Sequence, residues 1–180
     1  MAIYISILRG INVGGHNKIK MDDLRKLFAN AGFGKVQTYI QSGNIIFETK
    51  KTTTIFLEKI IADEIKKQFG FNVPVLVIEL EELKNVIKNN PFAKDKLKNE
   101  NYLHVTFLSG KPAKENIAQI IAGNFLPDEF IVINKAVYLH CPNGYGNTKL
   151  NNNFFENKLK LTATTRNWKT VNEILKIAEE

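Results

Sequence analysis

Residues 7–15, Ile-Leu-Arg-Gly-Ile-Asn-Val-Gly-Gly, carry an apolar segment directly into a polar loop with two adjacent glycines. Residues 3–8 are short, β-branched and aromatic, which predicts a strand. Loops in which a strand gives way to glycine often hold ligands, because a residue without Cβ lets backbone N–H groups approach closely. This stretch therefore marks both the start of a sheet and the expected position of a site.

The residues that follow predict a repeating pattern of helices and strands. Leu24, Leu27, Phe28 and Ala31 recur at the spacing of one helix face. Residues 36–40 and 45–47 predict a hairpin around the turn residues 42–44. A helix capped within residues 52–54 and a strand at residues 73–78 complete the order β-α-β-β-α-β, which is typical of a ferredoxin-like unit.

The second half repeats this order in part. We expect helices at 81–88, 115–122 and 154–161, strands at 102–108, 130–133 and 136–140, and a last helix through 171–178. No fourth strand is predicted there, and the lysine-rich residues 94–101 are expected to form a linker or flexible loop. The predicted fold is α+β, with two ferredoxin-like halves at residues 1–79 and 80–180. The second half is expected to be incomplete and closed by C-terminal helices.

Composition narrows the class of protein. The 180 residues are 44% hydrophobic and carry a net charge of +7. Residues 1–79 hold 11 basic and 7 acidic side chains (+4) and the remainder 14 and 11 (+3), so the excess is spread evenly. Nucleic-acid binding prefers a clustered basic stripe, so the even spread of charge weakens that interpretation.

The single cysteine, Cys141, fits a reducing cytosol. No apolar run approaches the roughly 18 residues of a membrane span, so a cytoplasmic location without membrane association is expected.

Topology predicts that distant polar residues meet at one sheet edge. In a β-α-β-β unit, the first strand ends at the edge where the hairpin turns. Arg9, Asn12, Gly14 and Gly15 should therefore lie near Ser42 and Asn44, together with Lys18, Lys20 and Gln41. Cations, amides and a helix N-terminus suit a phosphate or carboxylate. Two acidic residues at that helix end, Asp22 and Asp23, oppose an anion. In the alternative interpretation the glycines, Ser42 and Asn44 only shape tight turns.

A second polar segment spans residues 162–170 and contains Arg166, Asn167 and Trp168. Thr164, Thr165 or Asn167 is able to cap the last helix, and Trp168 to anchor the core. The alternative is that Arg166 and Asn167 face a ligand with Trp168 beside them, and with Lys149 adding charge. The candidate ligand-binding residues are Arg9, Asn12, Gly14, Gly15, Ser42, Asn44, Lys149, Arg166, Asn167 and Trp168.

Other chemistries find little support. His16, His104 and His140 lie far apart in the sequence, and no Cys/His pair has metal-ligand spacing. Adjacent strand residues point to opposite faces, so His140 should not activate Cys141. No metal, cofactor or catalytic residue is predicted, and the sequence leaves open whether the chain is an enzyme.

Several segments together resemble a known family. Residues 8–15, 38–44 and 163–170, with 146–150 and 155–159 between them, are similar to the signatures of the bacterial domain-of-unknown-function family 1697. The resemblance implies two ferredoxin-like halves and a cytoplasmic bacterial protein, and it implies no activity and no catalytic residue. Asn147 and Thr148 stand where the family often has other polar residues.

Two functional hypotheses follow. The first is that the chain binds an anionic small molecule or a nucleotide at a cleft between its halves. The alternative is a module that binds nucleic acid or protein through its basic surface. An RNA-recognition motif is disfavoured, because its third strand normally supplies several stacking rings and residues 42–47 contain only Phe47.

Overall fold

We describe a computed structural model that covers residues 1–180 and divides into two compact units. The first unit holds Met1–Lys84 with Ile174–Glu180, and the second holds Asn85–Glu173. Each unit contains a four-stranded antiparallel sheet, and six α-helices complete a mixed α+β fold. The predicted α+β class is confirmed, whereas the division into domains 1–79 and 80–180 stays a prediction. None of the helices has the length and apolar character needed to cross a membrane.

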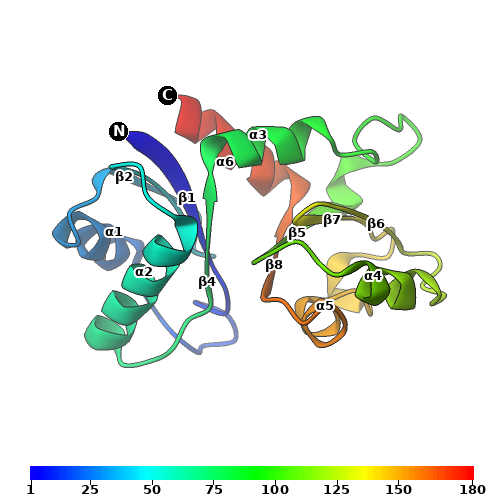
Figure 1. Ribbon diagram of the computed structural model, residues 1–180, viewed down its shortest axis with the longest axis horizontal. Helices are drawn as coiled ribbons and strands as arrows, with labels where there is room; N and C mark the ends of the chain where they lie inside the picture. The colour runs from blue at the N-terminus through cyan, green and yellow to red at the C-terminus, as the bar shows by residue number, and fades with distance from the viewer. The chain divides into compact units, whose positions relative to one another are not determined.

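The first unit follows the predicted order of elements. Its strand order is β2-β3-β1-β4, with all neighbours antiparallel. The helices α1 and α2 lie on one face of this sheet (Figure 1). The elements are β1 (Ala2–Leu8), α1 (Met21–Asn30), β2 (Gly34–Tyr39), β3 (Asn44–Thr49), α2 (Thr54–Phe69) and β4 (Val75–Glu79).

Aromatic side chains fill the core between this sheet and its helices. Tyr4 and Phe47 occupy paired positions of β1 and β3, so both project to the helix-covered face. The ring centroid of Phe47 lies 5.3 Å from that of Phe28 and 4.7 Å from that of Phe33. The Tyr4 hydroxyl donates to the carbonyl oxygen of Thr52 at 2.8 Å, which satisfies its one buried polar group.

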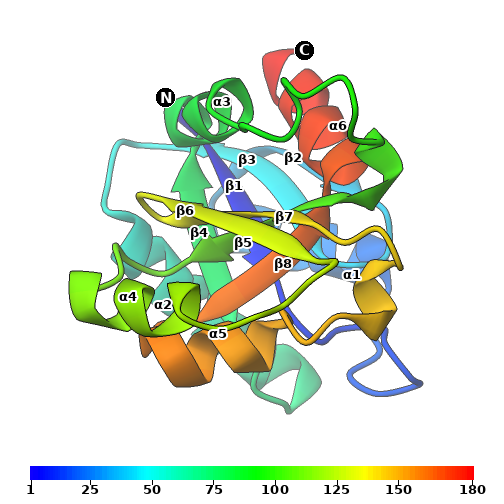
Figure 2. The ribbon, with the colours of Figure 1, turned by 90° about the vertical axis from the view of Figure 1, so that its right-hand side faces the viewer.

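The second unit has the same element order. Its strand order is β6-β7-β5-β8, again antiparallel throughout, and α4 and α5 pack on one face (Figure 1). The elements are β5 (Leu103–Leu108), α4 (Lys114–Ile121), β6 (Glu129–Ile133), β7 (Ala136–His140), α5 (Asn152–Leu159) and β8 (Ala163–Asn167). Two further helices, α3 (Leu80–Lys88) and α6 (Trp168–Glu179), follow the last strand of each sheet (Figure 2).

The strand β8 corrects the expectation that the second half is incomplete. Its sequence, Ala-Thr-Thr-Arg-Asn, lacks the apolar alternation by which a strand is recognised. It pairs with β5 as an edge strand, and tertiary contacts satisfy its polar groups. The hydroxyl of Thr165 lies 2.7 Å from that of Thr106 and donates to Asn152 Oδ1 at 2.7 Å. Side-chain hydrogen bonds of Thr165 therefore accompany backbone pairing in a strand that has no apolar pattern.

The turn between β2 and β3 approaches the end of β1 very closely. The Leu8 N–H donates to the Gly43 carbonyl at 2.8 Å. A Cβ on Gly43 would lie 2.7 Å from Leu8 Cβ and 2.8 Å from Ile11 Cδ1, and the φ of Gly43 is +80°. Only glycine meets both requirements, because other residues add a clash and strain in the left-handed region.

Substitution of Gly43 by alanine tests this contact against a matched position. Gly10 also has a positive φ, +73°, but open space around its Cβ position. We expect Gly10→Ala to lower the free energy of unfolding by about 1–2 kcal/mol through strain. We expect Gly43→Ala to lower it by a further ~1–3 kcal/mol through overpacking. Urea unfolding measures both, and equal losses would contradict the importance of the close approach.

Candidate functional site

The loop after β1 and the β2–β3 turn meet through one asparagine. Asn12 Nδ2 donates to the carbonyl oxygens of Ile19 and Gln41, each at 2.9 Å. Asn12 Oδ1 accepts the Ile19 N–H at 2.9 Å. The first predicted convergence is therefore present: the loop of residues 9–20 lies against the hairpin turn. The Asn12 amide itself bonds to the backbone and acts as a brace.

The loop is also bonded internally. The Asn12 N–H donates to the Asn17 carbonyl at 3.2 Å, and Asn17 Nδ2 donates to the Gly10 carbonyl at 3.0 Å. Asn12 and Asn17 adopt positive φ values of 55° and 46°, which asparagine tolerates better than most residues. Gly14 and Gly15 lie exposed at the tip, with φ of 58° and 80°. These φ values lie in the left-handed region, which explains why glycine occupies both positions.

Ser42 and Asn44 hold the turn together. Asn44 is fully buried, and its Nδ2 donates to the Tyr39 carbonyl and to Ser42 Oγ, both at 3.0 Å. These bonds account for a polar side chain in the core. Arg9 is half-buried where β1 ends, and its backbone N–H donates to the Pro74 carbonyl at 3.1 Å. Three of the six predicted N-terminal site residues, Asn12, Ser42 and Asn44, therefore carry structural hydrogen bonds.

A cavity of about 640 Å³ opens beside the braced loop, which we name the loop cavity. Lysine side chains and the N-terminal end of α1 line it together with apolar groups. Its lining residues are Asn12, Gly15, Lys18, Ile19, Lys20, Asp23, Gln41 and Phe69. Of these, sequence reasoning placed Lys18, Lys20 and Gln41 at this edge but left them out of the candidate set. Phe69 ends α2 and had no sequence signal at all.

Electrostatics at the helix end favour an anion more than the sequence suggests. Lys20 is the N-cap of α1, and its side chain makes no capping hydrogen bond. Asp22 forms an ion pair with Arg25, on the turn that follows it along the helix. Arg25 also donates to the Thr38 hydroxyl. The lining of the loop cavity therefore contains two lysines and one carboxylate, that of Asp23.

The four remaining candidates lie in the second unit. Asn167 Oδ1 accepts the Thr170 N–H at 2.8 Å and so caps α6, and Trp168 is buried. This agrees with the interpretation of a cap and a core anchor. Arg166 Nη1 donates to the Thr165 carbonyl at 2.9 Å, and burial lowers the pKa of Arg166 to about 10. Lys149 is exposed. That these residues share a site with Arg9 and Asn12 stays a prediction.

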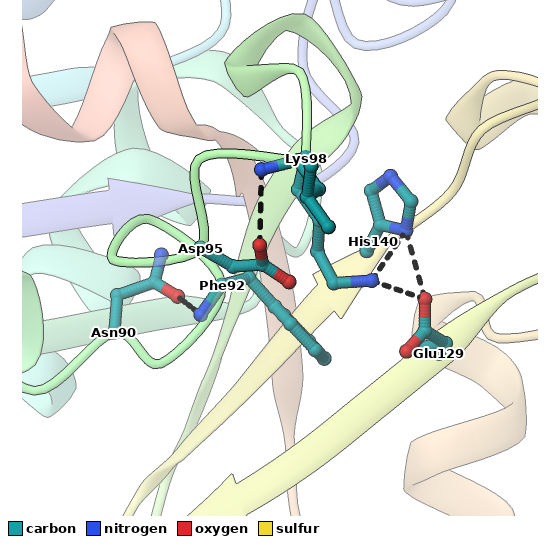
Figure 3. Close-up of polar contacts among 7 residues, drawn as sticks. Asn90, Phe92, Asp95, Lys98, Glu129 and His140 are labelled. Atoms are coloured by element: carbon teal, nitrogen blue, oxygen red, sulfur yellow. Dashed lines mark hydrogen bonds and ion pairs between the residues drawn. The ribbon is translucent and has the colours of Figure 1, made fainter.

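A second polar cluster, which the sequence reasoning missed, joins residues 90–98 to β6 and β7. Lys98 Nζ forms an ion pair with Glu129 and lies 3.4 Å from His140 Nδ1 (Figure 3). His140 Nδ1 lies 3.1 Å from Glu129 Oε1. The Lys98 ammonium also lies 5.2 Å from the ring centroid of Phe92, within the range of a cation–π contact. The segment 94–101, expected to be a linker or flexible loop, therefore contacts the sheet through Lys98.

One part of this cluster had a sequence signal. The two-residue turn at residues 134–135 pairs Ile133 with Ala136, and the same register places Glu129 opposite His140. Lys98 had no such signal, because its segment has no periodicity. The Asn90 Oδ1 accepts the N–H groups of Phe92 and Ala93, which gives the segment its turn.

The surroundings of Cys141 do not favour a reactive thiolate. Burial raises the pKa of the Cys141 thiol to about 11, so the thiol stays protonated at neutral pH. Burial likewise lowers the pKa of His104, whose ring stacks on Tyr145 with centroids 4.8 Å apart. These environments fit the expectation that Cys141 is a structural thiol.

The Lys98 ion pair predicts a specific pH dependence. The hydrogen bond from Lys98 lowers the pKa of Glu129 below its ordinary value of 4.5. A carboxyl with a lowered folded-state pKa stabilises the fold above about pH 4.5 and loses that contribution as the pH falls through its folded pKa. We expect Glu129→Gln to lose less stability than the wild type between about pH 5 and pH 3.

Glu64→Gln is the matched control for this measurement. Glu64 is 41% exposed, close to the 42% of Glu129, but its partner Lys67 is 79% exposed, against 15% for Lys98. Solvent screening leaves such a surface pair with little effect, so Glu64→Gln should keep the wild-type pH profile. Thermal unfolding across this pH range measures all three proteins. A profile of Glu129→Gln parallel to the wild type would contradict the prediction.

Comparisons with known proteins agree with the fold. A family model described as "Protein of unknown function (DUF1697)" matches residues 1–138. The structure of the conserved bacterial protein SP0830 from Streptococcus pneumoniae is similar, with a TM-score of 0.75 and 24% sequence identity. The alignment covers 98% of each chain, and at this identity it supports the fold alone. None of the curated proteins matches the chain.

Proposed function

We propose that this chain, which belongs to the DUF1697 family of proteins of unknown function, binds an organic anion with an apolar body in the loop cavity. The carrying observation is the combination of lining groups: two lysines and a helix N-terminus beside the apolar side chains of Ile19 and Phe69. The volume of about 640 Å³ lies within the range of small-molecule sites.

The anionic group belongs at the start of α1. The first-turn N–H groups carry a partial positive charge and point out of the helix end. Lys18 and Lys20 add two full charges against the one of Asp23, so the cavity keeps a positive excess. A phosphate or a carboxylate accepts hydrogen bonds from both kinds of donor.

The apolar body belongs against Phe69 and Ile19. The ring of Phe69 stacks on that of Phe71 with centroids 6.2 Å apart, and this contact helps to fix the orientation of the Phe69 ring. An aromatic or aliphatic group there removes apolar surface from water, worth about 25 cal/mol per Å² before the losses of binding. The braced backbone at Asn12 keeps the cavity wall in place, which reduces the entropy lost on binding.

The broader site of the sequence analysis belongs to the same proposal. In it, Arg9, Ser42 and Asn44 are joined by Lys149, Arg166, Asn167 and Trp168 around a nucleotide or similar metabolite. Binding of nucleic acid or protein through the basic surface remains the alternative, with the charge of +7 as its support.

Three small probes test the proposal on the full chain. Phenyl phosphate carries both features, inorganic phosphate only the charge, and phenol only the ring. A ligand that binds the native state alone raises the melting temperature, and saturation at about 100 times Kd adds ~2.7 kcal/mol of stability. We expect phenyl phosphate to raise the melting temperature more than the other two together.

Charge variants locate the bound anion. Lys18→Gln and Lys20→Gln should each weaken phenyl phosphate binding by up to about five-fold, as loss of a solvent-screened charge contact predicts. Lys26→Gln is the control, since Lys26 is exposed on α1 and lies outside the lining. Equal affinities of all three variants, or binding of a short oligonucleotide in place of phenyl phosphate, would overturn the proposal.

We also propose that both units are ferredoxin-like and that the protein works in a bacterial cytoplasm. Support for the first comes from the order β-α-β-β-α-β in each unit and the equivalent strand orders β2-β3-β1-β4 and β6-β7-β5-β8. Support for the second comes from the single buried cysteine and from the bacterial origin of the similar structure.

A further inference from the structure

The strand β6 is an edge strand without the usual protection against pairing. It contributes five consecutive residues to a continuous register with β7, and its sequence is Glu-Phe-Ile-Val-Ile. Edge strands are normally blunted by lysine, proline or a bulge, because their free N–H and C=O groups accept another strand. The strand β6 contains no lysine, proline or bulge, and its one charged side chain, Glu129, stands at its first position in an ion pair with Lys98.

The outer strand of the other hairpin shows the contrast. The strand β2 also lies at a sheet edge, but its register with β3 shifts between Gly34 and Gln37. Lys35 falls in this irregular stretch, is exposed and has a φ of 43°. At the same position in the fold, the first unit therefore has an irregular edge strand with a lysine, and the second unit has a regular edge strand without one.

Apolar surface continues from the edge of β6. Ile131 is 38% exposed, Ile121 65% and Leu126 77%. All three line one cavity of about 310 Å³, together with Phe125 and Phe130. Exposed apolar groups gathered around one hollow mark an interaction surface more than a random surface does.

Charges at the two ends of β6 identify the occupant. Asp128 precedes the strand and Glu129 begins it, while Lys135 follows its end. When two copies of β6 run antiparallel with Ile131 opposite Ile131, the turn residues Asn134 and Lys135 of each copy lie next to Asp128 at the acidic end of the other. A parallel arrangement would place the acidic ends together, which is unfavourable across strands. The strand is thus self-complementary under a two-fold axis.

We propose that two copies of this chain associate through β6, pairing antiparallel with Ile131 at the two-fold axis. The four-stranded sheet that contains β6 in one copy then continues into the same sheet of the other copy, as one eight-stranded sheet. Backbone hydrogen bonds hold the strands together, and the apolar side chains around Ile121 and Leu126 are covered from the second copy. This assembly is independent of ligand binding in the loop cavity.

Sedimentation equilibrium of the full chain tests the association. We expect a concentration-dependent dimer for the wild type, since a five-residue strand pair buries a modest interface. Ile131→Lys should give a monomer, because it places two lysines directly opposite each other at the axis. Ile55→Lys is the matched control, since Ile55 is 74% exposed on α2, and it should remain a dimer.

A cysteine variant tests the register and does not depend on the folding of Ile131→Lys. Residues directly opposite in an antiparallel pair have Cβ atoms about 4.5–5.5 Å apart, near the spacing of a disulfide. Oxidised glutathione should therefore convert Ile131→Cys into a covalent dimer on a non-reducing gel, and Ile55→Cys should stay monomeric there. The native Cys141 is buried in both variants.

Three results would overturn the proposal. The first is a wild type that stays monomeric up to about 1 mM. The second is a folded Ile131→Lys that dimerises as well as Ile55→Lys. The third is equal cross-linking of the two cysteine variants, which would mean that any dimer forms elsewhere or in another register.

Discussion

The close approach of Gly43 to Leu8 and Ile11 is the constraint on which the first unit depends. Because Gly43 lacks Cβ, its carbonyl reaches the Leu8 N–H at 2.8 Å, and Ile11 occupies the space that a Cβ would need. The end of β1 is then fixed beside the β2–β3 turn. The loop that follows starts from a fixed point, and Asn12 bonds it to Gln41. The loop cavity has a stable wall for this reason.

This arrangement explains how far the sequence predicts the site. The convergence of the loop and the turn follows from topology, because a β-α-β-β unit brings these segments to one edge. The roles of Asn12 and Asn44 do not follow, since each amide could face a ligand or the backbone. That choice depends on the φ of 55° at Asn12 and the complete burial of Asn44. Both are tertiary properties that a single sequence does not display.

The second unit shows a similar limit to what the sequence predicts. Apolar alternation identifies β5 and β7. The strand β8 is polar, and the hydrogen bonds of Thr165 with Thr106 and Asn152 that accompany it have no such signal. The pairing of Glu129 with His140 follows from the hairpin register, but the addition of Lys98 does not. In each case, periodicity and register predict contacts within a sheet. Contacts from aperiodic segments depend on the packed structure.

Comparison of the two units shows how the connection after the first strand differs between them. In the second unit, residues 109–113 connect β5 to α4 by a short path. Ser109 there exchanges hydrogen bonds with Thr162, its N–H donating at 3.0 Å and its Oγ accepting at 3.0 Å, so the edge is closed. In the first unit, the longer segment of residues 9–20 takes the same place and bends around Asn12. The same element order therefore carries a short, directly bonded connection in the second unit and a longer, internally bonded one beside the loop cavity in the first.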